Sequence, residues 1–364
     1  MNTPADAVAH FNRGRSCEMA ADYASARDAY AEAVRLDPGL FAARLQLAVV
    51  LERLRQPELA LVQYKRALSD AQRQGHWLNE ATTPPLMRTL IQHAVRTVRA
   101  GHHALFDRLF APLRERYGRD SLARIEQGIR IYLNEEPAVY PDPRQKPSLL
   151  YIPGLPTRAY FDCTSMPWVE QLEARTPQIV AELQLLLQTD AGRERVFPTD
   201  ELEEQNLRAS LESPPTWNGY YFYRWGARRE DNCARCPDTA RALDALPLCR
   251  IRQHGPEVLF SVFTAGTHLL PHRGVTNTRS VGHLALIVPP DCRLRVGGEV
   301  YEWRPGKVVV FDDTYEHEAW NNSSSMRVVL IFDLWNPFMT EAERAACADL
   351  VAALGDLRSA AETG

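Results

Sequence analysis

Residues 283–337 read HLALIVPPDCRLRVGGEVYEWRPGKVVVFDDTYEHEAWNNSSSMRVVLIFDLWNP, a series of short apolar runs separated by turn residues. Gly297-Gly298 and Pro305-Gly306 stand between the runs, and the first pair predicts a β-hairpin. A further run, VLFSVF, precedes them at 258–263. Closely spaced short strands with turn signals predict an antiparallel barrel or jelly roll. The segment 168–187 is expected to form a helix that packs outside this sheet.

The first 70 residues repeat with a period of 34. Gly14 and Ala48 keep this offset, and Pro38 ends the first unit because proline stops a helix. The other matched positions are Ala26, Tyr30, Ala33 and Val34 with Ala60, Tyr64, Ala67 and Leu68. This pattern resembles a pair of tetratricopeptide repeats, with a plain helical bundle as the alternative. Because two repeats rarely stand alone, helices are also expected over 85–99 and 103–133.

The sequence therefore predicts an α+β chain with several domains. A helical repeat domain is expected over residues 1–135, followed by a linker over 136–150, where EEPAVYPDPRQKP carries four prolines. The sheet domain is expected over 151–345. A C-terminal helix or tail fills 346–364.

Composition excludes several classes of protein. The 364 residues are 24% charged and 45% hydrophobic, with a net charge of -4, so nothing favours nucleic acid as a partner. No apolar run is long enough to cross a membrane, and the N-terminus does not resemble a secretory signal. Seven cysteines at irregular spacing do not indicate a disulfide framework. These features predict a reduced, cytoplasmic protein.

The candidate chemistry lies in the strand-rich region. His272 follows the VLFSVF strand, and His317 stands 45 residues later in a carboxylate-rich turn. Two neutral imidazoles on rigid elements, with open positions beside them, are typical of a metal site. Ten residues further on, Arg327 begins an apolar strand, where a guanidinium needs a carboxylate partner.

This order of residues resembles the 2-oxoglutarate oxygenases. Their usual motif places a carboxylate two residues after the first histidine, but the residue here is Gly274. The aspartyl/asparaginyl β-hydroxylases share that departure. The matching segments are GTHLLPHRGVTNTR (266–279), HLALIVPPDCRLRV (283–296), WRPGKVVVFDDTYEHEAWNNSS (303–324) and MRVVLIFDLWNP (326–337). The similarity to that family covers roughly residues 150–340.

The resemblance implies a double-stranded β-helix (cupin-like) oxygenase. It implies that His272 and His317 alone hold Fe(II), with water or ligand in place of the carboxylate. Arg327 and Ser261 would hold the distal carboxylate of 2-oxoglutarate, and His283 would contact its other end. With O2, such an enzyme hydroxylates an unactivated carbon. The family favours the β-carbon of an aspartyl or asparaginyl residue in a peptide or protein, or of a free amino acid.

Several alternatives stay open. Val281 stands where family members often carry an arginine that helps to bind cosubstrate or substrate. Related enzymes also act on acyl chains of lipids, whereas helical repeats favour a peptide or protein substrate. The alternatives to a hydroxylase are a scaffold whose barrel is inactive and a halogenase, because Gly274 leaves room for chloride on the iron.

Other polar residues have simpler interpretations. His268 is expected to be structural, and His283 and Ser261 have core-filling alternatives. At least one carboxylate near His317 is expected to orient its imidazole. We interpret Cys233-x-x-Cys236 as a pair of free thiols in a solvent-exposed loop. Some family members have a disulfide, and only Cys233 has a counterpart in it. Arg228-Arg229 predicts a solvated face, with a clamp for a substrate carboxylate as the alternative.

Overall fold

A computed structural model describes residues 4–189, 192–210 and 214–363. The chain divides into two compact units. The helical unit contains the residues up to Pro112 together with those from Ala353 onward, and the sheet unit contains Leu113–Ala352.

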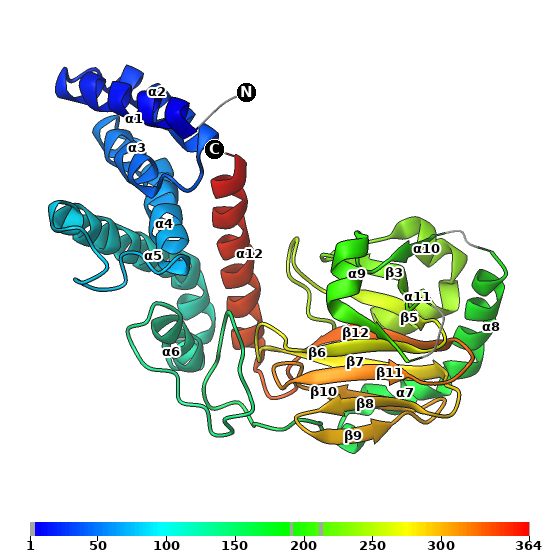
Figure 1. Cartoon of the computed structure of the whole chain (residues 1–364). Coiled ribbons are helices and arrows are strands. Elements are labelled where there is room, and N and C mark those ends of the chain that lie inside the picture. The colour runs from blue at the N-terminus through cyan, green and yellow to red at the C-terminus, as the bar shows by residue number, and fades with distance from the viewer. Residues whose placement is uncertain (1–3, 190–191, 211–213, 364) are drawn as a thin grey trace. The chain divides into compact units, whose positions relative to one another are not determined.

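The helical unit begins with two helical hairpins (Figure 1). Tyr30 donates a hydrogen bond to Glu18 over 2.7 Å, and Tyr64 donates one to Glu52 over 2.8 Å. Both pairs are again 34 residues apart, so the two hairpins are built alike, as the repeat predicts. The helices are α1 (Pro4–Met19), α2 (Tyr23–Leu36), α3 (Phe41–Arg53) and α4 (Pro57–Arg73).

The next helices differ from the prediction. A 3-10 turn (Pro85–Met87) leads into α5 (Arg88–Tyr117), which is one helix of 30 residues, so the expected interruption near residue 100 is wrong. The chain instead breaks at Gly118, whose φ of +80° favours glycine. A second 3-10 turn (Asp120–Leu122) precedes α6 (Ala123–Tyr132).

Helix α6 belongs to the sheet unit. Arg124 forms an ion pair with buried Glu343 at 2.6 Å. A Cβ at Gly128 would lie 2.5 Å from the side chain of Ile152, so the helix packs directly on this segment. The expected domain boundary at 135 therefore lies inside the sheet unit.

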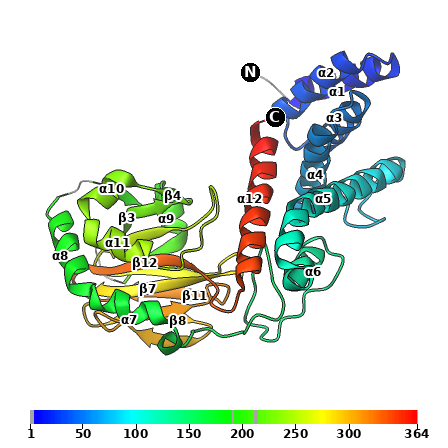
Figure 2. The same cartoon turned by 180° about the vertical axis from the view of Figure 1, so that it is seen from behind.

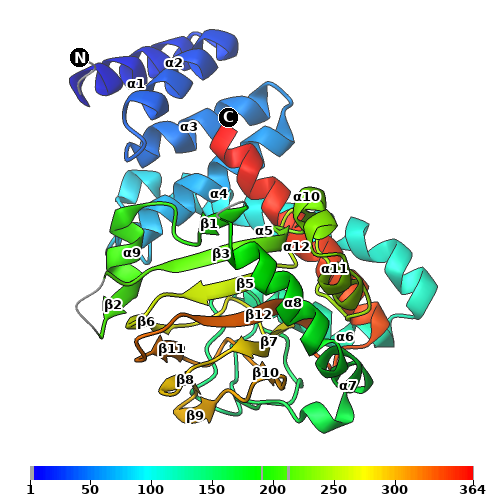
Figure 3. The same cartoon turned by 90° about the vertical axis from the view of Figure 1, so that its right-hand side faces the viewer.

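The sheet unit contains two stacked antiparallel sheets (Figure 3). The larger has the order β1 (Arg193–Arg195), β3 (Trp217–Arg224), β5 (Val258–Phe263), β12 (Arg327–Trp335), β7 (Arg279–Ile287) and β10 (Val308–Phe311), with β4 (Ala227–Arg228) beside β3. The smaller has the order β2 (Leu207–Ala209), β6 (Thr267–His272), β11 (His317–Asn321), β8 (Cys292–Val296) and β9 (Glu299–Glu302). This arrangement confirms the predicted jelly roll. The hairpin at Gly297-Gly298 is also confirmed, because Val296 pairs with Glu299 and both glycines have positive φ.

Side-chain alternation divides the larger sheet into two faces. Phe260, Leu284 and Leu330 point outward and pack under α7 (Pro167–Ala174), α8 (Thr176–Leu187) and α11 (Pro237–Asp244), which Figure 2 shows on one side of the sheet. The helix expected over 168–187 is two helices, since Pro177 cannot donate to a continuing helix. Inward-facing residues form a second core between the sheets.

The remaining helices are η3 (Cys163–Ser165), α9 (Asp200–Asn206), α10 (Glu230–Arg235) and the C-terminal α12 (Glu341–Thr363). The proline-rich segment 136–150 lies on the sheet unit. Gln145 donates to Asp312 over 2.6 Å, and Arg144 donates to the carbonyl of Gly297 over 2.8 Å. All seven cysteines, which lie in described parts of the chain, are free thiols. Within the described ranges, no helix is long and apolar enough to cross a membrane.

Candidate active site

His272 ends β6, and His317 begins β11 directly opposite it. The Nδ1–H of His272 donates to the carbonyl of Leu270 over 2.8 Å, and that of His317 donates to the carbonyl of Tyr315 over 3.0 Å. With the proton on Nδ1, each Nε2 has a free lone pair for a metal. Burial and the neighbouring His272 lower the pKa of His317 to about 4, which keeps its imidazole neutral at pH 7. Backbone carbonyls orient both rings, so the expectation of an orienting carboxylate is wrong.

Asp313 fills the space next to Gly274. The amide of Gly274 donates to the carbonyl of Asp313 over 2.6 Å, and a Cβ at Gly274 would lie 2.2 Å from the Asp313 carboxylate. Oδ2 of Asp313 accepts a hydrogen bond from Arg279, whereas Oδ1 is buried without a partner. Among the described residues, no group of three or more His, Cys, Asp or Glu side chains is arranged to hold a metal. The two imidazoles are therefore the protein ligands available for a metal, and the other coordination positions stay open for other ligands.

A cavity of about 340 Å³ opens between the two sheets at these histidines. Its lining includes Ser261, His283 and Arg327, which lie on the inner faces of β5, β7 and β12. The structure thus brings all five predicted site residues to one cavity.

Arg327 is buried in this cavity, and no carboxylate in the described parts of the chain forms an ion pair with it. Its side chain is among the largest fully buried ones, and its Nη1 donates to the carbonyl and hydroxyl of Ser261 over 3.3 and 3.2 Å. The guanidinium lies 3.7 Å from the ring centroid of Phe263, and its Nε has no hydrogen-bond partner among the residues that the structure describes. Trp217 donates to the same Ser261 hydroxyl over 2.9 Å. Burial lowers the pKa of Arg327 to about 9, so an anionic ligand would relieve an unfavourable desolvation.

His283 also has an unused polar atom. Its Nδ1 is buried and forms no hydrogen bond with any described residue, and its ring lies near Trp303 and Phe311 at centroid distances of 5.9 and 5.1 Å. Burial lowers the pKa of His283 well below its usual value, so the ring is neutral. Sequence reasoning missed Trp303 and Trp217 as parts of the site. Trp303 lies within a segment that resembles the family, which was the available signal.

These residues fit the two groups that the sequence implies. Two free imidazole nitrogens suit a first-row metal such as Fe(II) with positions left for other ligands. A buried, uncompensated arginine in the same cavity suits the far carboxylate of a dicarboxylic acid.

The other sequence candidates lie in different surroundings. His268 pairs with Glu318 at 2.7 Å and has a structural role. Cys233 and Cys236 are buried, so the expectation of exposed thiols is wrong.

The two arginines at 228 and 229 are engaged by acidic side chains outside the cavity. Arg228 contacts Glu230 and Asp244, and Arg229 contacts Glu194 at 2.8 Å. They are not arranged as a clamp for a substrate in this cavity.

Comparisons with known proteins agree with the geometry. A family model described as "Aspartyl/Asparaginyl beta-hydroxylase" matches residues 173–337, and one described as "Tetratricopeptide repeat" matches residues 7–40. Aspartate beta-hydroxylase domain-containing protein 2 from Homo sapiens is 34% identical over 260 residues, which cover 68% of this chain and 67% of that protein. Ornithine lipid ester-linked acyl 2-hydroxylase from Rhizobium tropici is 34% identical over 185 residues, covering 50% and 62%. Aspartyl/asparaginyl beta-hydroxylase from Homo sapiens is 36% identical over 143 residues, covering 39% and 18%. The chain belongs to the aspartyl/asparaginyl β-hydroxylase family.

Proposed function

We propose that this protein is an Fe(II)- and 2-oxoglutarate-dependent dioxygenase that hydroxylates an unactivated carbon. One observation carries the proposal: two neutral imidazoles with free Nε2 atoms share a cavity with Arg327, a buried cation that no described carboxylate neutralises. A 2-oxo acid with a second carboxylate would interact with both parts of the site. Its oxo acid end would chelate a metal held by the two imidazoles, and its second carboxylate would pair with Arg327.

The residues have separate tasks in this proposal. His272 and His317 would hold the iron through Nε2. Arg327 and Ser261 would bind the distal carboxylate of 2-oxoglutarate. The carbonyl and hydroxyl of Ser261 also accept hydrogen bonds from the guanidinium. The unpartnered Nδ1 of His283 would face the oxo acid end.

The reaction converts R–H, 2-oxoglutarate and O2 into R–OH, succinate and CO2. One oxygen atom of O2 enters the product and the other enters succinate. When bound, iron supplies the activation of O2, which no amino-acid side chain can provide. The protein binds the cosubstrate, keeps the metal-binding nitrogens deprotonated and surrounds the reacting carbon with apolar walls that exclude water.

The substrate expected from the family is the β-carbon of an aspartyl or asparaginyl residue, in a peptide or as a free amino acid. Relatives bear the names of both an aspartyl/asparaginyl hydroxylase and a lipid acyl hydroxylase, so membership of the family does not choose between these substrates. The helical repeats would recruit a peptide or protein partner. We propose a cytoplasmic location.

Two alternatives are less well supported. A scaffold with an inactive barrel would gain nothing from an unpaired guanidinium, whose burial costs several kcal/mol. A halogenase needs room for chloride beside the iron, but the Asp313 carboxylate fills the space at Gly274 and would repel an anion.

Succinate formation tests the proposal. Full-length protein with Fe(II), O2 and 2-oxoglutarate is expected to release succinate above a metal-free control, and more when a true substrate is added. The matched variant His317→Ala is expected to release none above that control. Equal release by both proteins would contradict the proposed metal site.

A further inference from the structure

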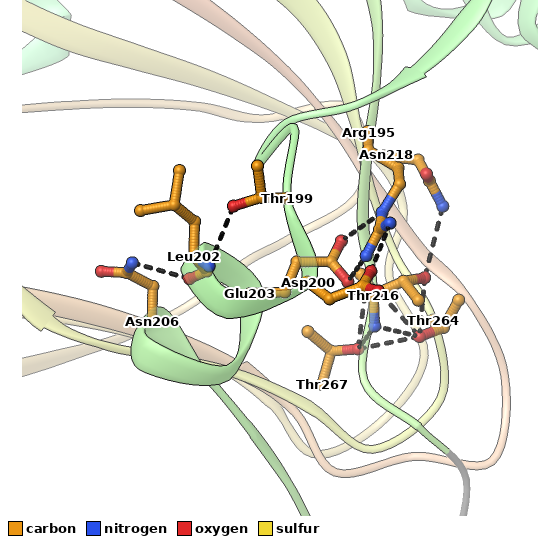
Figure 4. A network of polar contacts seen from close by, with 10 residues as sticks. All are labelled: Arg195, Thr199, Asp200, Leu202, Glu203, Asn206, Thr216, Asn218, Thr264 and Thr267. Atoms are coloured by element: carbon orange, nitrogen blue, oxygen red, sulfur yellow. Dashed lines mark hydrogen bonds and ion pairs between the residues drawn. The ribbon is translucent and has the colours of Figure 1, made fainter. Parts of the chain in front are cut away.

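Hydrogen bonds join the strands at the end of the cavity where Arg327 lies. Arg327 pairs across the sheet with Phe263, the last residue of β5, and Thr264 follows directly. The amide of Thr216 donates to the Thr264 hydroxyl over 3.0 Å, and the hydroxyls of Thr264 and Thr267 lie 2.9 Å apart (Figure 4). Because these contacts connect β3, β5 and β6 at this end, we expect a substrate to enter at the other one.

The opposite end of the cavity is exposed. Val275, three residues beyond the end of β6, lines the cavity and is 43% exposed. Trp225, just beyond the end of β3, is 64% exposed. Its backbone amide donates to the carboxylate of Glu257, which lines the cavity just before β5 begins. A substrate that enters at this end therefore passes Glu257.

The two arginines that line this end are paired with acidic side chains. Arg279 contacts Asp313 at 2.7 Å and Asp333 at 3.1 Å, so two carboxylates share its single charge. Arg273 contacts Glu316 at 3.3 Å. Neither arginine is free to neutralise a further carboxylate.

Arg224, the last residue of β3, also has an acidic partner. Its guanidinium forms an ion pair with Glu194, which Arg229 contacts as well, at 2.8 Å. It lies 4.4 Å from the ring centroid of Tyr221 and 4.7 Å from that of Trp225. Arg224 is therefore held by Glu194 and two aromatic rings.

Glu257 is left without an ion pair in the described parts of the chain. It stands two residues before Leu259, which also lines the cavity, so alternation places both side chains on the same face of the sheet. Its backbone amide donates to Oδ2 of Asp333 over 2.9 Å, which fixes the start of the strand. Burial raises the pKa of Glu257 to about 7, as expected for a carboxyl group that loses water without gaining a cation.

This end of the cavity consequently carries an excess of negative charge. Three arginines stand against four carboxylates, namely Arg224, Arg229 and Arg279 against Glu194, Glu257, Asp313 and Asp333. A substrate carboxylate would lose its hydration here and meet repulsion. A cationic nitrogen would instead donate a charge-assisted hydrogen bond to Glu257.

We propose that Glu257 determines substrate specificity by pairing with a positively charged nitrogen of the substrate, an ammonium or guanidinium group. This inference rests on the proposed function and adds to it the charge of the substrate. Two sources supply such a nitrogen: a basic side chain next to the hydroxylated residue of a peptide, or a small free amine. Both present the same chemistry to Glu257, and the experiment separates them.

Binding is measured by calorimetry on full-length protein loaded with Mn(II) and 2-oxoglutarate, which together cannot turn over. One arm uses three pentapeptides with a central Asn and a neighbouring Lys, norleucine or Glu. The other arm compares butylamine with butanol. The cationic probe is expected to bind at least about tenfold more tightly than the uncharged one, because it gains a charge-assisted hydrogen bond.

The two arms distinguish the sources of the nitrogen. A preference for the cation in the peptide arm alone identifies a basic peptide residue, and a preference in the amine arm shows that a free amine is sufficient. The absence of a preference in both arms would overturn the proposal, and so would tightest binding of the Glu peptide.

Variants assign the preference to Glu257. Glu257→Gln removes the charge but keeps an oxygen that accepts from the Trp225 amide, so it is expected to fold and to reduce the preference to less than about threefold. Glu257→Asp keeps the charge on a shorter side chain and should retain part of the preference. The matched control is Glu299→Gln, because Glu299 is exposed on β9 and is not among the lining residues. An undiminished preference in Glu257→Gln would overturn the assignment, and so would an equal loss in Glu299→Gln.

The binding of 2-oxoglutarate separates the two levels of the account. If Mn(II)-loaded wild type binds 2-oxoglutarate but shows no preference for a cation, the assignment of Glu257 fails and the dioxygenase proposal survives. If 2-oxoglutarate itself does not bind, the proposed function fails.

Discussion

His272 and His317 are cross-strand neighbours on β6 and β11, and the centroids of their imidazole rings lie 4.1 Å apart. Both rings donate from Nδ1 to the carbonyl of the residue two positions earlier in the chain. The same local hydrogen bond therefore leaves the Nε2 atom of each histidine free to bind a metal.

The first prediction follows from this pair. His272→Ala and His317→Ala are each expected to reduce Fe(II) or Mn(II) binding from about one ion per chain to none, because one remaining imidazole is too few protein ligands. Metal content after gel filtration measures this. His268→Ala is the control, since His268 pairs with Glu318, and it should keep the metal. Full metal occupancy in both site variants would show that the metal lies elsewhere.

The second prediction concerns the space beside the metal. Gly274→Ala is expected to lower the free energy of unfolding by about 1–3 kcal/mol, because its Cβ would collide with the Asp313 carboxylate. Gly274→Asp should likewise fail to raise activity, even though it restores the usual carboxylate. Denaturant unfolding of Gly274→Ala in an Asp313→Gly background provides the comparison. In that background Gly274→Ala should lower the free energy of unfolding by less. An unchanged loss would show that a collision with Asp313 is not the reason.

The third prediction concerns pH. The folded protein holds a proton on Glu257 more tightly than the unfolded chain does, since burial raises the pKa from 4.5 to about 7. Unfolding then releases this proton between about pH 4.5 and 7, so the contribution of Glu257 to the free energy of unfolding falls as pH rises through that window. Glu257→Gln should flatten this part of the stability profile. A profile parallel to wild type would argue against a raised pKa.

The fourth prediction concerns the boundary of the sheet unit. A protein beginning at residue 113 should unfold at a higher temperature than one beginning at 136, because only the first keeps α6 with its Arg124–Glu343 pair and the close contact of Gly128 with Ile152. Calorimetric unfolding compares the two. Equal melting temperatures would mean that α6 adds no stability.

The sequence predicted much of the site through its resemblance to the family, which covers the segments that carry these residues. Ser261, His283 and Arg327 fall on inward positions of three apolar strands, and their convergence follows once these strands share a sheet. What the sequence did not predict depends on long-range contacts. Arg279 and Asp333 are 54 residues apart, and no local pattern indicates that they form an ion pair.

Helix α5 illustrates the same limit. Gly101 suggests an interruption when only the sequence is considered. In the structure it lies within the helix, and a Cβ there would be 2.6 Å from the Leu61 side chain on α4. The glycine permits close helix packing, which only the tertiary structure shows.

The fifth prediction separates the binding role of Arg327 from stability. Arg327→Met is expected to leave the ligand-free protein as stable as wild type or more stable by about 1–4 kcal/mol, because it removes a buried charge without a counter-ion. The same variant should lose the rise in melting temperature that 2-oxoglutarate with Mn(II) gives wild type. Arg327→Lys should recover part of that rise, since a point charge cannot replace the planar guanidinium. A full rise in Arg327→Met would exclude this residue as the anchor.

Calorimetric titration of 2-oxoglutarate into Mn(II)-loaded, full-length wild type tests the central claim most directly. We predict binding of about one molecule per chain, weakened by about 2–5 kcal/mol in Arg327→Ala because a charge-assisted contact is lost. Absence of binding to the metal-loaded wild type would contradict the claim that this cavity is the site of a 2-oxoglutarate-dependent dioxygenase.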